Sequence, residues 1–357
     1  MMSTPSGKKD ISARIEQIRQ RCGKDLVILA HHYQTDSIVR HVDFSGDSLE
    51  LARRIPDISA RHIVFCGVFF MAESACLLAR PGQRVYLPDH HAGCRMANMA
   101  RQKDVERILS SLQDSGRSVI PLAYVNSSLA VKAVVGRFGG AVCTSSNAVS
   151  MMEWALARAD TVLFLPDQNL GMNTANRLGI PASQQVIIDI EGKNLQSPAA
   201  KSARILLWPG FCPTHALDMV PSHVQEFRRQ NPGCRVLVHP ECTPEVVGLV
   251  DGAGSTAYLI KETEKAAHEG REKTLCIGTE YHLVNRLAKR FAGTLDVRPL
   301  VRATCPNMEK ITLPKLLATL EGMENGERSV YVVESLKAPA RETLVRMLDH
   351  CNAARAS

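Results

Sequence analysis

Three apolar passages of the chain end in polar residues of types that exchange protons or orient substrates. The passages are 27–33 (VILAHHY), 120–126 (IPLAYVN) and 236–241 (VLVHPE). Two polar residues lie two positions apart at each end, namely His31 and Tyr33, Tyr124 and Asn126, and His239 and Glu241. A turn with hydroxyl side chains follows each passage, at Gly46–Asp47–Ser48, Thr144–Ser145–Ser146 and Gly254–Ser255–Thr256. A sequence that repeats this pattern can build one shared centre.

Each repeat also reaches a cysteine in a turn that contains glycine or proline, at Cys94, Cys212 and Cys305. A helix N-terminus lowers the pKa of a thiol and favours the thiolate. Three thiolates from distant positions suit an iron–sulfur cluster with one iron left open, or a zinc site with three cysteine ligands. Zinc sites usually use paired ligands a few residues apart, and the chain has no Cys-x-x-Cys pair, so the spacing favours the cluster. The odd total of 11 cysteines argues against a disulfide framework.

The segments that must position these residues alternate between strand and helix patterns. Short apolar runs such as 27–30, 119–125 and 235–240 predict strands buried on both faces, as in parallel sheets. Helical patterns such as 103–113 lie between them, and a last strand is predicted at 330–333. We therefore expect an α/β fold of three similar three-layer αβα domains, in a pseudo-threefold arrangement around a central active site.

The spacing of the cysteines sets the expected domain boundaries. Cys94 lies 30 residues before Tyr124, and Cys212 lies 27 residues before His239. We predict three units, at 1–93 plus 306–357, at 94–211 and at 212–305. Strand–helix units look alike in any α/β protein, but matched polar positions, hydroxyl turns and cysteine spacing favour a true triplication.

Composition restricts the class of protein. The net charge is +7, but the basic residues are scattered and aromatic residues make up only 5%, so we expect no nucleic-acid partner. A mildly positive enzyme suits small anionic substrates. No apolar run approaches the roughly 20 residues of a membrane helix, and the N-terminus lacks the apolar core of a secretory signal. We therefore expect a cytoplasmic protein with no membrane partner.

A set of short motifs in a fixed order resembles one known family. The motifs are AHHYQ (30–34), GDS (46–48), HHAGCRMANM (90–99), YVNSS (124–128), TSSNAV (144–149), PGFCPTH (209–215), HPEC (239–242), GST (254–256) and ATCPNM (303–308). Each string is weak alone, but the ordered set is specific and resembles quinolinate synthase over about residues 25–315. That family condenses iminoaspartate with dihydroxyacetone phosphate, losing phosphate and water, to form quinolinate for NAD biosynthesis. The resemblance therefore implies a transferase.

The resemblance also implies a cofactor and a partner. The cofactor is an oxygen-sensitive 4Fe–4S cluster with three cysteine ligands, Cys94, Cys212 and Cys305, and one open iron. Some members carry a Cys-x-x-Cys-x-x-Cys run at the third ligand, but this chain has only Cys305 there. The redox switching associated with that run should therefore be absent. An L-aspartate oxidase is the candidate supplier of iminoaspartate.

The strand-end residues take expected roles in this chemistry. Proton transfers during condensation and aromatisation need acid–base groups, and the candidates are Glu241, Tyr33, His31 and His239, with Tyr124 positioning the intermediate. The two carboxylates and the phosphate of the substrates need hydrogen-bond donors. The expected substrate-binding residues are His31, Ser48, Tyr124, Asn126, Ser145, His239, Glu241, Ser255 and Thr256.

Two other functions also fit these residues. Another 4Fe–4S-dependent hydro-lyase would share the open iron, whereas a cluster-binding regulatory protein would bind nucleic acid through a basic face. His215 follows Cys212 by three residues, and it is either a partner close to the cluster or a helix-surface residue. The segment 251–257 imitates a dinucleotide fingerprint, but it lacks the acidic residue about 20 positions on, so we interpret it as the third hydroxyl turn.

Overall fold

The computed structural model describes residues 5–356, with side chains for residues 10–353. Residues 1–4 lie outside this range, and they are part of the N-terminal segment for which we expect no secretory signal. The chain forms two compact units. The first takes in the residues up to Cys94 together with Thr304–Val332, and the second takes in Arg95–Ala303 and the residues from Val333 onward. No helix in the described range is both long and apolar enough to cross a membrane.

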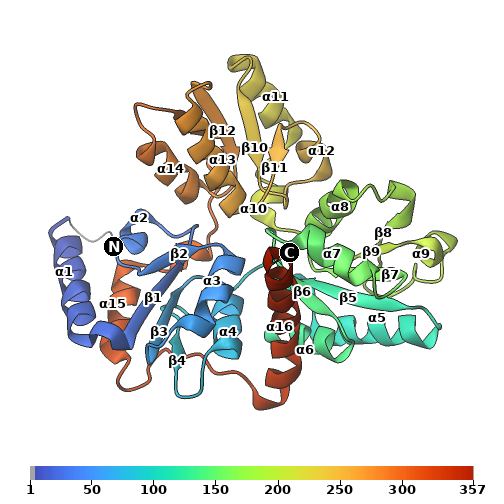
Figure 1. Cartoon of the computed structure of the whole chain (residues 1–357), viewed down its shortest axis with the longest axis horizontal. Helices are drawn as coiled ribbons and strands as arrows, with labels where there is room; N and C mark the ends of the chain where they lie inside the picture. The colour runs from blue at the N-terminus through green and yellow to red at the C-terminus, as the bar shows by residue number, and fades with distance from the viewer. Residues whose placement is uncertain (1–4, 357) are drawn as a thin grey trace. The chain divides into compact units, whose positions relative to one another are not determined.

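The first unit contains a parallel sheet in the order β2-β1-β3-β4 (Figure 1). Its strands are β1 (Leu26–His31), β2 (Phe44–Gly46), β3 (His62–Cys66) and β4 (Arg84–Tyr86). Its helices are α1 (Pro5–Cys22), α2 (Asp36–Val39), α3 (Ser48–Arg54), α4 (Phe69–Leu78) and α15 (Leu313–Gly322). α3 packs on α4, and α1 packs on α15. Every residue of β3 is buried, which is why its sequence is apolar without alternation.

The second sheet has the order β6-β5-β7-β9-β8 and is also parallel. Its strands are β5 (Val119–Tyr124), β6 (Ala141–Cys143), β7 (Thr161–Leu165), β8 (Gln185–Ile187) and β9 (Ile205–Leu207). The helices around it are α5 (Gln102–Asp114), α6 (Leu129–Arg137), α7 (Ala148–Leu156), α8 (Gln168–Arg177), α9 (Pro198–Ser202) and α16 (Glu334–Ala356). α5 packs on α6, and α7 packs on α8. α5 buries Val105, Ile108, Leu109 and Leu112, one stripe of an amphipathic helix.

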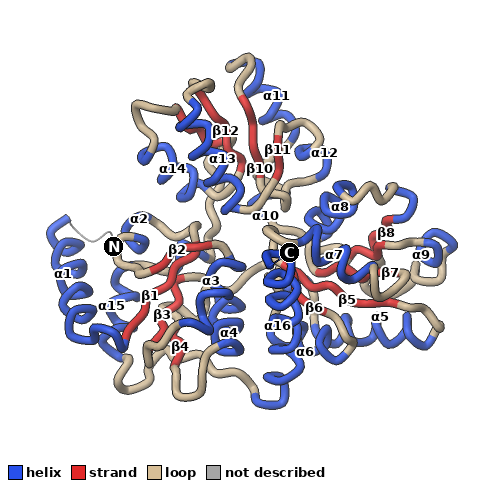
Figure 2. The backbone as a smooth tube through the Cα atoms, viewed as in Figure 1, coloured by secondary structure: helices blue, strands red, loops and turns tan. Residues whose placement is uncertain are grey.

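The third sheet belongs to the same unit as the second and has the order β11-β10-β12-β13. Its strands are β10 (Arg235–Val238), β11 (Gly252–Ala253), β12 (Thr274–Gly278) and β13 (Asp296–Pro299). The helices around it are α10 (Pro213–Ala216), α11 (Pro221–Gln230), α12 (Pro244–Val247), α13 (Thr256–Glu269) and α14 (Tyr281–Arg290). A core that includes Met219, Val236 and Cys276 fills the space beneath α11 and α12. Figure 2 shows helices on both faces of each of the three sheets, which confirms the expected α/β class with three αβα layers.

The three sheets share one connection pattern. In each, the strand that comes first in the chain is central, and the second and third strands lie on either side of it. Local contacts also repeat: Asp43 accepts a hydrogen bond from Ile28 N at 2.7 Å, and Asp251 accepts one from Val236 N at 2.7 Å. Each of these aspartates also forms a salt bridge with an arginine, Asp43 with Arg19 and Asp251 with Arg228. The connection pattern common to the three sheets supports the triplication read from the sequence, and the matched contacts occur in the first and third of them.

The C-terminal segment differs from the expected grouping of 306–357 with the first unit. α16 packs on α6 and β6 of the second sheet, because a glycine, Gly136, lets the two helix backbones approach. A Cβ atom at Gly136 would lie 1.9 Å from the carbonyl oxygen of Pro339 in α16. The strand predicted at 330–333 is wrong. Val330 is buried, but Tyr331 is 82% and Val333 59% exposed, and α16 begins at the next residue.

We expect Gly136→Ala to loosen α16 from α6. The added methyl group overlaps a backbone atom, so it should cost about 1–3 kcal/mol of unfolding free energy. Thermal unfolding of the variant and of Gly248→Ala measures this cost. Gly248 is a matched control, because a Cβ there would lie 3.3 Å from its nearest neighbour. Equal midpoints for the two variants would contradict the close helix contact.

Candidate active site

The polar strand ends and the hydroxyl turns lie side by side because parallel strands end at the same edge of a sheet. His31, the last residue of β1, pairs with Gly46 of β2, the first residue of the turn that holds Ser48. Tyr124, the last residue of β5, pairs with Cys143 of β6, and the same pairing occurs at the ends of β10 and β11. The sheet register therefore brings each hydroxyl turn beside its own strand end, as the repeat predicts.

In the first unit, His31 and Tyr33 form a local pair. The backbone N–H of Tyr33 donates to His31 Nδ1 at 3.2 Å, and the two rings meet edge to face with centroids 4.5 Å apart. Ser48 opens α3, whose N-terminus is capped by the carboxylate of Asp47. The third repeat makes the same local contact, because Glu241 N–H donates to His239 Nδ1 at 3.4 Å. The backbone of the two repeats thus orients each imidazole in the same way.

In the second unit, a buried carboxylate gathers the candidate residues from the two sheets. Glu241 is 3% exposed, and its Oε2 atom lies 2.6 Å from His215 Nδ1 and 3.7 Å from His239 Nδ1. The hydroxyl of Tyr124 also donates a hydrogen bond to Glu241. His239 Nε2 is 3.2 Å from the hydroxyl of Ser145, so a residue from each sheet takes part at this point as well. Tyr124, Ser145, His239 and Glu241 therefore form one connected group.

His215 belongs to this group and not to a helix surface. It is 1% exposed, and its ring stacks on that of His239 with centroids 4.6 Å apart. Its Nε2 atom is 3.1 Å from the hydroxyl of Thr279, and its Nδ1 atom is the one that meets Glu241. Of the two readings that the sequence left open, the helix-surface one is wrong. His215 orients the carboxylate by a charge-assisted hydrogen bond.

The protonation states follow from burial and from these partners. Burial by itself would raise the pKa of Glu241, but the adjoining imidazoles of His239 and His215 and the hydroxyl of Tyr124 hold that pKa well below its usual range. For Asp167, burial and the charge of Glu241 together raise the pKa well above its usual value. Burial lowers the pKa of His239 to about 3. At neutral pH the group therefore contains an ionised Glu241 and a neutral His239, and Asp167 takes up a proton more readily than an ordinary carboxyl group.

Several buried polar atoms have no hydrogen-bond partner among the described residues, and two of them belong to expected binding residues near strand ends. They are Asn126 Oδ1, two residues after the end of β5, and Thr256 Oγ1, the first residue of α13. Unsatisfied buried polar atoms are costly, so they indicate where a ligand binds. Ser255, by contrast, caps α13 by accepting a hydrogen bond from Tyr258 N–H. Its hydroxyl therefore has a structural role as well as the expected binding role.

A buried lysine shapes the loop that carries Asn126. Lys132 is fully buried in α6, and its Nζ atom donates to the carbonyl oxygens of Val125 at 2.8 Å and Ser127 at 2.5 Å. These carbonyls belong to the residues on either side of Asn126, so the cation fixes the backbone before and after that residue. Sequence reasoning missed Lys132. The available signal was a lone charge inside the apolar helix LAVKAVV.

The three candidate ligand cysteines are all partly buried. Cys212 is the N-cap of α10, and its backbone N–H donates to Asp167 Oδ2 at 3.1 Å. Cys94 and Cys305 precede single turns of 3-10 helix, at Ala97–Met99 and Met308–Lys310. Of the three, only Cys212 therefore directly precedes an α-helix. Elements this short carry little dipole, so side chains must position these thiols.

The metal-binding potential of this part of the chain lies at Cys212. The ligand atoms of Cys212, His215 and Glu241 lie within 4.8 Å of one another. However, His215 and Glu241 bind each other through the same atoms that a single ion would need. The donor set therefore fits a site in which the thiolate binds the metal group and the His–Glu pair lies beside it.

Two further residues hold this region and were not expected from the sequence. Asp167 follows β7 and Pro166, caps α8 through Leu170 N–H at 2.8 Å, and holds Cys212 with its other oxygen. Asn173 donates from α8 to the carbonyl oxygens of Pro240 and Cys242, which flank Glu241. Asp167 could have been found as a fourth polar residue after an apolar strand. Asn173 carries no such signal.

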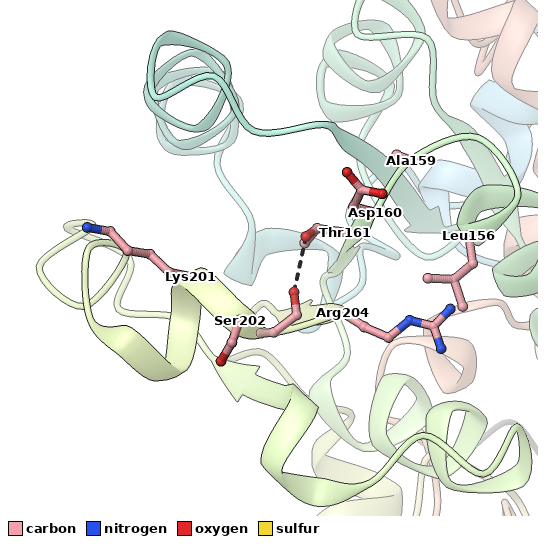
Figure 3. Close-up of a pocket in the computed structure, with 8 residues that line it drawn as sticks. Leu156, Ala159, Asp160, Thr161, Lys201, Ser202 and Arg204 are labelled. Carbon is pink, nitrogen blue, oxygen red and sulfur yellow. Dashed lines mark hydrogen bonds between the residues drawn. The ribbon is translucent and has the colours of Figure 1, made fainter.

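A cavity of about 350 Å³ lies elsewhere in the second unit (Figure 3). It is lined by residues at the amino ends of β7 and β9, including Asp160, Lys201 and Arg204, and Thr161 donates across it to Ala203 O at 3.1 Å. The candidate residues lie at the carboxyl ends of the strands. This cavity is therefore separate from the candidate active site.

Buried acid–base groups beside a cysteine, at the carboxyl edges of parallel sheets, define an α/β enzyme with a candidate metal centre. The family comparison makes this specific. Residues 13–349 match the model of the NadA family, described as quinolinate synthetase A protein. The chain belongs to that family.

Named relatives of similar length agree with this assignment. The quinolinate synthase of Acidobacterium capsulatum is 44% identical over 98% of this chain and 94% of its own length. Those of Bacillus velezensis and a Geobacillus species are 41% and 42% identical, over 97% and 95% of this chain and 96% and 93% of their own lengths. The similarity thus extends over both compact units.

We expect the cysteines to differ sharply in reactivity. Burial raises the pKa of the Cys66, Cys143 and Cys242 thiols well above the usual value. It raises the pKa of the Cys276 thiol to about 12. In folded, metal-free protein, iodoacetamide should therefore label these four at least about tenfold more slowly than partly buried Cys212. Mass spectrometry of labelled peptides measures the rates. Unfolded protein is the control, and equal labelling in the folded state would contradict the assigned burial.

Proposed function

We propose that the chain is a quinolinate synthase that condenses iminoaspartate with dihydroxyacetone phosphate, releasing phosphate and water, in NAD biosynthesis. The observation that carries this proposal is the ionised, buried Glu241, held by His215 and Tyr124 in a chain that matches the family throughout. We place the reaction in the cytoplasm. An L-aspartate oxidase is the proposed source of iminoaspartate.

The proposed cofactor is one 4Fe–4S cluster with three cysteine ligands, Cys94, Cys212 and Cys305, and one open iron. All three thiols are partly buried, whereas Cys66, Cys143 and Cys276 lie in the apolar core. Cys212 supports the proposal best, because Asp167 fixes its backbone beside the catalytic carboxylate. When bound, the open iron would supply a Lewis acid that eases loss of a hydroxyl group. The three proposed domains, divided near these cysteines, would face a common centre.

Proton transfer is the proposed role of the group around Glu241. Glu241 is ionised, and Tyr124 and His215 both donate to it, so its carboxylate can relay a proton between the groups that it contacts. His239 is neutral at neutral pH and reaches Ser145, which suits it to donate or accept a hydrogen bond without adding charge. The first unit contributes His31 and Tyr33 as further acid–base groups.

Substrate binding is the proposed role of the turns and of the loop after β5. Thr256 Oγ1 and Asn126 Oδ1 have no hydrogen-bond partner among the described residues, and a carboxylate or hydroxyl of the substrate would satisfy them. Ser48, Ser145 and Ser255 lie at or just before helix N-termini, where backbone N–H groups also favour anions. The substrates carry carboxylates and a phosphate, so this set of donors matches their charge.

The cluster and the activity are tested together by anaerobic purification. We expect about four irons and four sulfides per chain, and quinolinate formation from the two substrates. Changing Cys94, Cys212 or Cys305 to Ser should each abolish the cluster and the product, because each would remove one ligand. Cys22→Ser and Cys234→Ser are matched controls on partly buried cysteines and should leave both unchanged. Protein without iron after anaerobic preparation would refute the proposal.

Glu241→Gln tests the proposed base separately from the cluster. The amide keeps the shape of the side chain but cannot take up a proton, so kcat should fall by about 10²–10⁴-fold. The iron content should not change, because Glu241 is not a proposed ligand. Glu226→Gln, on the exposed surface of α11, is the control. A variant with near-normal kcat would assign the proton transfer to another group.

A further inference from the structure

The two cysteine-bearing loops of the first unit come from distant parts of the sequence. The loop before Cys94 follows β4, and the loop that holds Cys305 leads into α15. Neither loop has more regular structure than one turn of 3-10 helix. Something other than a helix or strand must therefore set the position of one thiol relative to the other.

Side chains connect these loops directly. Lys315, in the first turns of α15, places its Nζ atom 2.5 Å from Asp89 Oδ2 and 3.0 Å from the carbonyl oxygen of Lys310. Lys310 in turn donates to the carbonyl oxygen of His91 at 2.8 Å. The other carboxylate oxygen of Asp89 accepts from His91 N–H at 2.8 Å. Two lysines that follow Cys305 therefore hold the loop that precedes Cys94.

The charge at Asp89 makes this connection hard to replace. The residue is only 8% exposed, and a buried carboxylate must be paired. Burial alone would raise the pKa of Asp89, but the hydrogen bonds from Lys315 and from His91 N–H bring it below its usual range. The side chain is thus an ionised acceptor that both organises its own loop and binds α15.

The same contacts are not needed to hold the unit together. Leu87 N–H donates to Arg328 O at 3.1 Å, and Val330 N–H donates to Val85 O at 2.8 Å. These backbone bonds attach the 326–330 segment to β4 independently of Asp89. Loss of the Asp89–Lys315 contact should therefore change the position of the loop more than the stability of the unit.

We propose that Asp89, Lys310 and Lys315 form a clamp that sets the position of Cys94 relative to Cys305 before any cluster binds. The three are positioning residues and are not ligands. The inference rests on the proposed ligation of a cluster by these two cysteines. It adds that the chain prepares two of the three thiols for the cluster through charged side chains of one unit.

The variants separate the clamp from ordinary stability. Asp89→Asn keeps the shape of the side chain but removes its charge, and Lys315→Met removes the ammonium group while keeping most of the stem. Lys315→Arg keeps a cation at this position, so it should keep the contact with Asp89. Glu321→Gln is the matched control, since Glu321 also lies in α15 and pairs with Arg14 at 2.9 Å, on the exposed surface.

The first measurement is the anaerobic uptake of iron and sulfide by cluster-free protein, followed by visible absorption, and the loss of iron to a chelator. In Asp89→Asn and Lys315→Met we expect roughly tenfold slower uptake and roughly tenfold faster loss, as for other residues that orient metal ligands. Lys315→Arg and Glu321→Gln should behave like the unchanged chain. Thermal midpoints of the cluster-free variants should agree within a few degrees.

The second measurement needs no iron. Phenylarsine oxide bridges two neighbouring thiols with release of water, and mass spectrometry identifies the pair. In cluster-free Cys212→Ser protein we expect one arsenical to bridge Cys94 and Cys305, and Asp89→Asn should slow this reaction roughly tenfold.

The outcomes separate the two hypotheses. If the unchanged chain takes up no iron but the arsenical bridge depends on Asp89, the proposed cofactor fails and the clamp stands. If iron is taken up and neither the uptake nor the bridge depends on Asp89, the clamp is overturned and the cofactor stands. Failure of the bridge to form in the Cys212→Ser protein would also overturn the clamp. A large drop in thermal midpoint for both Asp89→Asn and Lys315→Met would also overturn the clamp, because the contact would then be an ordinary stabilising ion pair.

Discussion

The second unit depends on one buried negative charge. Glu241 lies where two sheets meet, and a carboxylate out of contact with water is stable only if it is hydrogen-bonded and paired. His215 in α10 and Tyr124 at the end of β5 meet that need, so the charge joins the elements on which they lie. Burial and the same charge together raise the pKa of Asp167, because two ionised carboxyl groups this deep would repel each other. The interaction that orders the interior is therefore also the one that keeps this carboxylate ionised.

The repeat supplies the frame, and its departures from symmetry supply the chemistry. His31 and His239 occupy equivalent strand ends and accept the same local hydrogen bond. Two residues on, the three repeats differ, with Tyr33, Asn126 and Glu241. A parallel sheet with an identical connection pattern can hold any of these side chains at its carboxyl edge, because the backbone register does not depend on them. The three repeats can therefore take up different roles without a change of fold.

Support for the site comes from segments distant in the chain. α16 packs on α6, and Asn147 donates to Cys351 of α16 while its Oδ1 accepts from Thr144 N–H at the hydroxyl turn. The C-terminal helix thus steadies the turn that carries Ser145. Asn173 and Lys132 act in the same way, each holding the carbonyl groups that flank a candidate residue. These contacts are side chain to backbone, so they fix loops that have no regular structure of their own.

The sequence by itself determined the α/β class, most strands, the three polar strand ends and the hydroxyl turns beside them. These features follow from the periodicity of apolar residues along the sequence and from the fact that parallel strands end at the same edge of a sheet. Only the tertiary structure decided that His215 is buried on Glu241, that Asp167 holds Cys212, that Lys132 shapes the loop of Asn126, and that α16 joins the second unit. Apart from the local contact of Lys132, these depend on which faces pack together, and packing at large sequence separation leaves no periodic trace. A charged residue shows its type in the sequence, but its partner, and hence its protonation state, exists only in the folded chain.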